Sequence, residues 1–107
     1  MKTEFNLLPE ITRRIVEAIH PEKIVLFGSR ARGDARSDSD YDILVLAESN
    51  LPRYHRAAGI YVALWEFAVP IDVVVYTPSE VEEWREARRA FVTTALREGR
   101  VLYERAH

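Results

Sequence analysis

Two short apolar runs, Ile24–Phe27 and Ile43–Leu46, enclose a segment crowded with charge, and this arrangement constrains the fold most. Each run is rich in branched side chains and bounded by polar residues, which is typical of a buried β-strand. The segment between them begins GSRARGD and ends SDSDYD. A plain connection between two strands does not require so much charge. We therefore interpret the segment as a phosphate and metal site, and the rest of the chain as its scaffold.

Length and composition fit one domain, spanning residues 1–107, with a hydrophobic core of its own. The chain has no Cys, which excludes disulfides and thiolate metal sites and fits a reducing compartment. Its net charge of -2 and pI near 5.9 argue against autonomous nucleic-acid binding, which normally needs a basic excess. The first twelve residues do not resemble a signal peptide, and no apolar run approaches the roughly 20 residues that span a bilayer. We expect a cytoplasmic protein that does not associate with membranes.

Apolar periodicity predicts an amphipathic helix over residues 8–19, ended by His20-Pro21, and a second helix over residues 51–67, capped by Asn50. Its aromatic residues suit a core or a partner surface. We expect four strands, at Lys23–Phe27, from about Asp40 to Leu46, at Ile71–Tyr76 and, at an edge of the sheet, at Val101–Tyr103. A capping box at Thr77–Glu80 begins a charged helix that extends to Arg89, with Trp84 packed on the body or on a partner. A last helix runs from Phe91 to a Gly99 cap.

Gly28-Ser29 turns the chain directly after the first strand. Ser29 alone is explained by capping a short helix over residues 30–32. A strand–Gly–Ser–helix turn also aims backbone N–H groups and a hydroxyl outward, which is how a phosphate is held at a helix N-terminus. The glycine allows a close approach of the backbone. Both interpretations remain open on these two residues alone.

Asp40 and Asp42 project from one face of the expected strand, because side chains two apart point the same way, and Tyr41 points to the opposite face. Two carboxylates at about 4 Å repel by about 4 kcal/mol at an effective dielectric of roughly 20. Arginines, protonation or metal ions offset such a cost. Hard divalent cations with oxygen ligands fit best, since no His or Cys lies nearby.

Asp72 interrupts an otherwise apolar strand. A carboxylate buried in such a strand is costly unless it is paired or bound to a cation. We therefore expect Asp72 to join Asp40 and Asp42 in one acidic site.

The combination of Gly28-Ser29, ten intervening residues, Asp40-x-Asp42 and a lone acid in the next strand resembles the DNA polymerase beta-like nucleotidyltransferase superfamily. GSRARG, SDYDILV and ALREGRVLYE are similar to its small stand-alone members, the minimal nucleotidyltransferases. Those resemble the antitoxin half of pairs whose other half is a HEPN-family ribonuclease toxin. The resemblance implies an α/β (α+β) fold with a mixed sheet of about four strands flanked by helices.

By this resemblance, Asp40, Asp42 and Asp72 form a two-metal Mg²⁺ site, and Asp72 also assists deprotonation of the acceptor hydroxyl. Gly28 and Ser29 then bind the β- and γ-phosphates of ATP. Arg30 and Arg32 are carried over by position as contacts to the triphosphate.

Larger relatives carry an extra domain for the acceptor, for which this chain has no room, so we expect a partner protein to present it. The antitoxin resemblance implies transfer of AMP from ATP to a tyrosine hydroxyl of a HEPN toxin. Two alternatives stay open: a module that neutralises its partner by occlusion without catalysis, and nucleotidyl transfer to a small molecule or an RNA end. The variant Asp42→Asn distinguishes catalysis from occlusion, because the substitution should abolish AMP transfer but leave neutralisation by occlusion intact.

Overall fold

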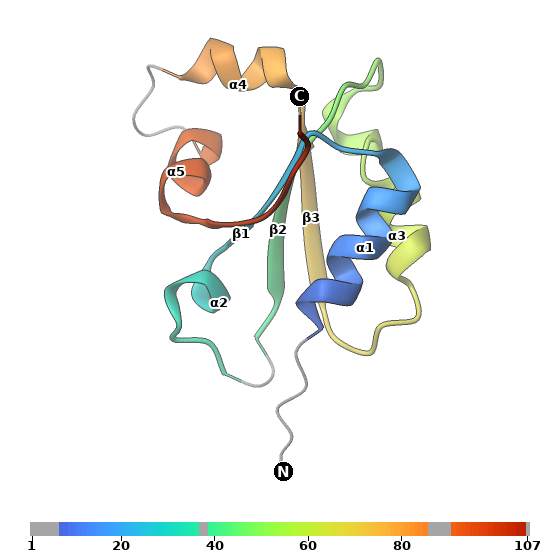
Figure 1. Cartoon of the computed structure of the whole chain (residues 1–107), viewed down its shortest axis with the longest axis vertical. Helices are drawn as coiled ribbons and strands as arrows, with labels where there is room; N and C mark the ends of the chain where they lie inside the picture. The colour runs from blue at the N-terminus through green and yellow to red at the C-terminus, as the bar shows by residue number, and fades with distance from the viewer. Residues whose placement is uncertain (1–6, 37–38, 86–90, 107) are drawn as a thin grey trace.

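The computed structural model describes residues 7–36, 39–85 and 91–106. It contains a four-stranded mixed sheet with helices packed on both faces (Figure 1). Its elements are α1 (Leu8–Ile19), β1 (Lys23–Phe27), α2 (Ser29–Arg32), β2 (Tyr41–Leu46), the 3₁₀ turn η1 (Arg53–His55), α3 (Ala58–Leu64), β3 (Ile71–Tyr76), α4 (Pro78–Trp84), α5 (Phe91–Glu98) and β4 (Arg100–Glu104). The expected fold class, an α+β fold with a mixed sheet of four strands, is confirmed.

The strand order is β3-β2-β1-β4. β1 runs antiparallel to both β2 and β4, and β2 runs parallel to β3. The predicted bounds of β1 and β3 are confirmed, β2 starts at Tyr41, and β4 lies at the predicted edge but begins one residue earlier and ends one later. In this register Phe27 pairs with Asp42 on one side, and Asp42 pairs with Asp72 on the other.

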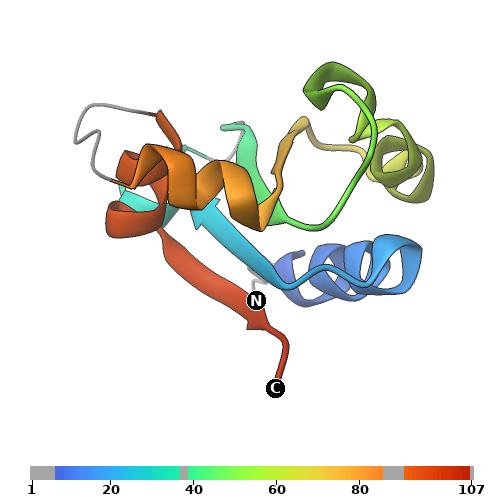
Figure 2. The same ribbon diagram turned by 90° about the horizontal axis from the view of Figure 1, so that it is seen from above.

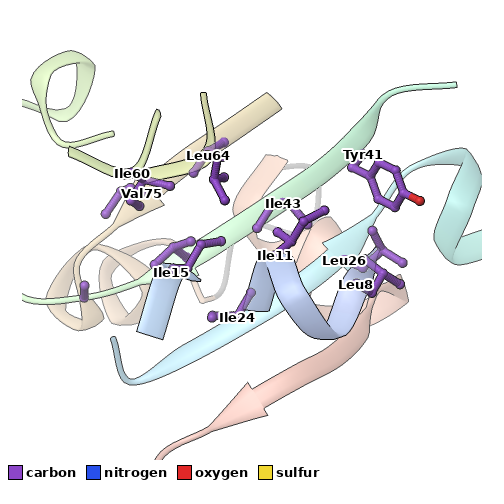
Figure 3. Close-up of a cluster of buried hydrophobic side chains, with 13 residues drawn as sticks. Leu8, Ile11, Ile15, Ile24, Leu26, Tyr41, Ile43, Ile60, Leu64 and Val75 are labelled. Atoms are coloured by element: carbon purple, nitrogen blue, oxygen red, sulfur yellow. The ribbon is translucent and has the colours of Figure 1, made fainter. Parts of the chain in front are cut away.

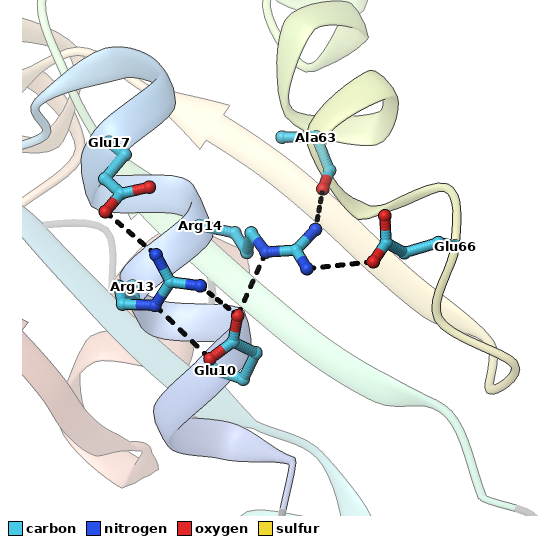
Figure 4. Close-up of polar contacts among 6 residues, drawn as sticks. All are labelled: Glu10, Arg13, Arg14, Glu17, Ala63 and Glu66. Carbon is cyan, nitrogen blue, oxygen red and sulfur yellow. Dashed lines mark hydrogen bonds and ion pairs between the residues drawn. The ribbon is translucent and has the colours of Figure 1, made fainter.

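Helix α1 follows its sequence signals closely. Ile11 and Ile15 are fully buried, a proline occupies the first turn, and His20 ends the helix in the left-handed conformation (φ 49°), where its N–H donates to Val16 O. The opposite face carries charges of both signs. Arg14 joins α1 to the end of α3, donating to Ala63 O at 3.0 Å and to Glu66 Oε2 at 2.9 Å (Figure 4).

The sheet separates two clusters of apolar side chains. α1 and α3 cover one face, and α4 and α5 lie on the other (Figures 1 and 2). Figure 3 shows the larger cluster, in which side chains of α1 and α3 meet those of β1, β2 and β3. Tyr41 points to this side, opposite to Asp42, as predicted, and its side chain is buried. The smaller cluster, between the sheet and α5, is formed by Val25, Leu44, Leu46, Tyr76, Val92 and Ala95. Fewer helical residues cover this second face.

The helix predicted over residues 51–67 is wrong in its extent. The structure has η1 and the shorter α3 there, and Ala57, not Asn50, precedes α3. Pro52 is extended (ψ 149°), and a proline disfavours the helical conformation of the residue before it. The Arg56 guanidinium donates to Leu51 O and Val75 O, which holds the segment in its irregular path.

One predicted cap differs from the structure. Gly28 occupies the N-cap of α2, so Ser29 is its first helical residue. Gly99 follows the last residue of α5 as predicted, and its N–H donates to Ala95 O. Its φ is negative, and the need for glycine comes from a close approach, because an added Cβ would lie 2.5 Å from Val25 Cγ1. The Thr77–Glu80 capping box of α4 is confirmed in both directions. Trp84 ends α4, half-exposed, and residues 86–90 of the predicted charged helix lie outside the described residues.

Across the described ranges, no helix has the length and apolar character needed to cross a membrane.

Candidate functional site

Three carboxylates gather at one end of the sheet, on the face that α5 covers. Asp40 immediately precedes β2, Asp42 is its second residue, and Asp72 is the second residue of β3. Asp42 and Asp72 are in register on parallel strands, whose spacing is about 4.8 Å. Their chain neighbours Ile43 and Val73 belong to the cluster on the opposite face, so both acids point away from it. The predicted third carboxylate therefore lies beside the pair.

The electrostatics of Asp42 reflect this grouping. Burial raises the pKa of the Asp42 carboxyl above its ordinary value, and the charges of Asp72 and Asp40 raise it further, while Arg32 acts in the opposite direction. Two neighbouring negative charges disfavour the ionised form of this carboxyl group, and a cation bound among the three carboxylates would favour it. The acids thus form one electrostatically coupled set at this end of the sheet.

Asp72 differs from the sequence-based expectation in one respect. Its side chain is exposed, because the helices on this face leave the start of β3 uncovered. The argument from the cost of burying a lone carboxylate is therefore wrong for Asp72. Its accessibility instead makes it available to a substrate or an ion.

Gly28 packs directly against Asp42. Its backbone is in the positive-φ region (φ 77°), and an added Cβ would lie 2.2 Å from Asp42 Oδ2. Any side chain at position 28 would therefore displace the carboxylate. The glycine is required both by its backbone conformation and by the space that Asp42 fills.

Ser29 follows at the start of α2, whose Ala31 and Arg32 N–H groups both donate to Gly28 O. In general, the first N–H groups of a helix are not used by the hydrogen bonds within that helix and are oriented toward its N-terminal end. Beside this turn lies a hollow of about 150 Å³ between α2, β1 and α5. It is lined by Phe27, Gly28, Ala31, Arg32, Phe91, Thr94, Ala95 and Glu98. The hollow opens next to the predicted phosphate-binding turn.

The two arginines of α2 have different surroundings. The Arg30 guanidinium stacks over the Tyr41 ring at 3.9 Å and donates to Ser39 O at 2.8 and 3.1 Å, so it holds the loop before β2. Arg32 is 60% exposed, pairs with Asp34 Oδ2 at 3.3 Å and contributes to the field at Asp42. Arg32 therefore adjoins the acids directly, whereas the contacts of Arg30 are structural.

The donor set is chemically suited to a hard divalent cation such as Mg²⁺, since it offers carboxylate oxygens and no thiolate. In the described part of the chain, no three acidic, His or Cys side chains converge into a finished ligand cluster. Like charges repel, so the carboxylates spread apart at this end of the sheet.

Tyr61 of α3 is a further member of this region that the sequence did not single out. Its hydroxyl accepts a hydrogen bond from Val73 N at 2.7 Å and lies 3.4 Å from Asp72 Oδ1. Burial raises the pKa of the Tyr61 hydroxyl, so it stays protonated at neutral pH. In sequence Tyr61 is one of several aromatic residues at helical spacing, and nothing local marks its contact with β3.

Comparison with known proteins places the chain in a family. Residues 8–102 match the nucleotidyltransferase domain family. The chain belongs to this family. A Methanocaldococcus jannaschii protein, provisionally named a protein adenylyltransferase, is 36% identical over 84 residues, which cover 77% of this chain and 78% of that protein. The chain is accordingly a nucleotidyltransferase, as the resemblance implied.

Solved structures share the fold of this nucleotidyltransferase. A Sulfolobus solfataricus protein provisionally described as a nucleotidyltransferase is 26% identical with a TM-score of 0.57, over 72% of this chain and 69% of that one. A toxin-antitoxin crystallised with AMP-PNP is 25% identical with a TM-score of 0.58, over 92% and 73%. The toxin-antitoxin MntA-HpeT, at 23% identity and a TM-score of 0.59 over 94% and 75%, supports the fold alone.

Proposed function

We propose that this nucleotidyltransferase is an antitoxin of the minimal type, which transfers AMP from ATP, with Mg²⁺, to a tyrosine hydroxyl of a HEPN-family toxin. The observation that carries the proposal is the in-register pair Asp42 and Asp72 beside Gly28. The name of one relative, a protein adenylyltransferase, supports a protein as the acceptor. The similar toxin-antitoxin structure with AMP-PNP, an ATP analogue, supports ATP as the nucleotide. We further propose that residues 1–107 form one such domain, acting in the cytoplasm.

Asp40, Asp42 and Asp72 are the proposed ligands of Mg²⁺, whose positive charge would draw their spread carboxylates together. When bound, Mg²⁺ neutralises phosphate charge and favours attack at the α-phosphorus. The Asp72 carboxylate, which is exposed at the start of β3, accepts the proton of the acceptor hydroxyl. The acceptor oxygen forms a bond to the α-phosphorus, the bond to the bridging oxygen breaks, and pyrophosphate leaves.

The turn after β1 supplies the proposed nucleotide site. The backbone of Gly28 and the N–H groups and hydroxyl at Ser29 bind the β- and γ-phosphates, as helix N-termini bind anions. Arg32, exposed beside the acids, adds positive charge to the same anion. Arg30 contributes by holding the loop through Ser39, and a direct phosphate contact would require it to leave Tyr41.

Exposed aromatic residues provide a surface for the protein that presents the acceptor. Tyr54 and Trp65 are 81% and 77% exposed on the α3 side of the sheet. Tyr54 lines a groove of about 630 Å³ that also reaches Tyr61, whose hydroxyl lies 3.4 Å from Asp72 Oδ1. A partner seated there could bring a hydroxyl to the third carboxylate.

The test is intact-protein mass spectrometry with the product of the neighbouring gene as the candidate partner, ATP and Mg²⁺. We expect the partner to gain one or more AMP masses, with fragmentation placing them on tyrosine. Omission of Mg²⁺ or the variant Asp42→Asn abolishes the gain. Asp34→Asn is the matched control, because Asp34 is an exposed acid in the neighbouring loop and should transfer normally.

A partner that is neutralised without any gain in mass would instead support occlusion. AMP appearing on RNA or a small molecule, with none on the partner, would move the assignment to that acceptor class.

A further inference from the structure

Tyr61 closes the outer edge of the sheet. β3 pairs with β2 on one side only, because it is the last strand in the order β3-β2-β1-β4. On its other side the Tyr61 hydroxyl accepts Val73 N–H at 2.7 Å and lies 3.4 Å from Val73 O. The side chain therefore occupies the place of a missing strand at this residue. Ile60 and Leu64, fully buried or nearly so, fix the helix that carries it.

The same hydroxyl faces the third carboxylate, with 3.4 Å between Tyr61 Oη and Asp72 Oδ1. The amide of Val73 uses an acceptor site of the hydroxyl, so its single proton remains free to point to Val73 O or to Asp72. A charged acceptor makes the stronger bond. Hydroxyl bonds are usually about 2.5–3.0 Å long, and a small rotation of the Asp72 side chain would close the gap.

The position of the Asp72 carboxylate needs such a restraint. The terminal torsion of an aspartate is broad, and Asp72 is exposed, so packing does not fix its oxygens. A group that accepts a proton in a reaction must be held close to its productive geometry. Tyr61 offers a donor whose own oxygen is anchored to the strand that carries Asp72.

We propose that Tyr61 is a positioning residue, whose hydroxyl holds Oδ1 of Asp72 and so orients the carboxylate toward the acceptor. The inference rests on the proposed function for the role of Asp72, and on the structure for the contact. Tyr61 touches neither the nucleotide nor the reacting atoms in this account; it acts through Asp72.

Tyr61→Phe removes only the hydroxyl, and Tyr103→Phe is the matched control, because Tyr103 lies on β4, at the opposite edge of the sheet from β3. We expect Tyr61→Phe to lower kcat of AMP transfer by about 10- to 100-fold, with KM for ATP changed less than about threefold. Tyr103→Phe should leave kcat unchanged. Tyr61→Phe also removes the acceptor of the part-buried Val73 N–H, so the melting temperature should fall by a few degrees, and kcat is therefore taken per folded molecule.

A second measurement does not depend on activity. NMR three-bond couplings of Asp72 report whether its side chain keeps one rotamer or averages over several. We expect one rotamer in the wild type and in Tyr103→Phe, and averaging in Tyr61→Phe.

Unchanged couplings in Tyr61→Phe would overturn the inference, whether or not the wild type transfers AMP. Averaged couplings would support it even with an inactive wild type, in which case only the proposed function fails. A kcat that falls only in proportion to unfolded protein would assign Tyr61 a structural role and also overturn the inference.

Discussion

Arg56 and Glu80 form an ion pair that joins three segments, and its contribution to stability can be worked out from the structure. The Arg56 guanidinium donates to both carboxylate oxygens of Glu80, at 2.7 and 3.0 Å, and to Val75 O of β3. Glu80 also accepts Thr77 N–H in the capping box of α4. Their side chains are only 9% and 24% exposed. The pair therefore ties the loop before α3 to β3 and α4.

The Arg56 guanidinium lowers the pKa of the Glu80 carboxyl from 4.5 to about 2. By linkage this corresponds to about 3 kcal/mol of stability at neutral pH, and partial solvent exposure reduces it to about 2–3 kcal/mol. Because the folded-state pKa is depressed, the contribution is complete above the unfolded pKa and is lost as the pH falls through the folded value. Glu80→Gln removes the charge and keeps the shape.

We expect Glu80→Gln to lower the free energy of unfolding at pH 7 by about 2–3 kcal/mol, or the melting temperature by roughly 9–13 °C for a chain of this length. The deficit relative to the wild type should stay constant above about pH 5.5 and fall by about half by pH 3. Urea denaturation across this pH range measures it.

Glu82→Gln is the control on the same helix, because Glu82 and its partner Arg85 are each 66% exposed, and such pairs contribute about 0–1 kcal/mol. A deficit for Glu80→Gln equal to that control, or one that does not shrink toward pH 3, would refute the reasoning.

Two glycine comparisons test the packing of the site and of α3. Gly28→Ala should reduce AMP transfer at least 100-fold in the same mass assay, because the added Cβ would displace the Asp42 carboxylate. Gly33 also has a positive φ (85°), but a Cβ added there would meet no atom within 4 Å. Gly33→Ala should therefore lower the free energy of unfolding by about 1–2 kcal/mol and retain transfer. Equal losses of transfer for the two would contradict the close packing of Gly28 on Asp42. Gly59→Ala, in the first turn of α3, where an added Cβ meets no atom within 4 Å, should instead raise the free energy of unfolding by about 0.5–1 kcal/mol, measured in urea. A loss of stability there would show that the helix needs the glycine.

Local signals in the sequence were sufficient for the elements that depend on their own residues. The bounds of α1, β1 and β3 follow from periodicity and flanking prolines, and the α4 capping box follows from Thr77 and Glu80. The proximity of Asp40 and Asp42 follows from strand geometry. Asp72 was expected beside them from the cost of burying a lone carboxylate, whereas in the structure the register of the parallel strands aligns it with Asp42. Their roles as metal ligands remain predictions.

The features that the sequence did not disclose depend on distant contacts. The predicted helix over residues 51–67 ignored the bonds of Arg56 to Val75 and Glu80, which favour an irregular path. The exposure of Asp72 depends on where α5 ends over the sheet, and the contact of Tyr61 depends on how α3 crosses the edge. No local pattern encodes these arrangements, because each is set by packing between elements.

The pairing of Asp42 with Asp72 also ties the site to the folding of the chain. These residues are brought together by the parallel alignment of two strands that a long excursion through α3 separates. A slip of one residue would turn Asp72 to the face covered by α1 and α3, and would set an apolar side chain beside Asp42. Misregistered or partly folded molecules therefore possess the same amino acids but no acidic cluster. The AMP-transfer activity of a sample should therefore be proportional to its fraction of natively folded molecules. On heating, activity and native structure should be lost in the same transition.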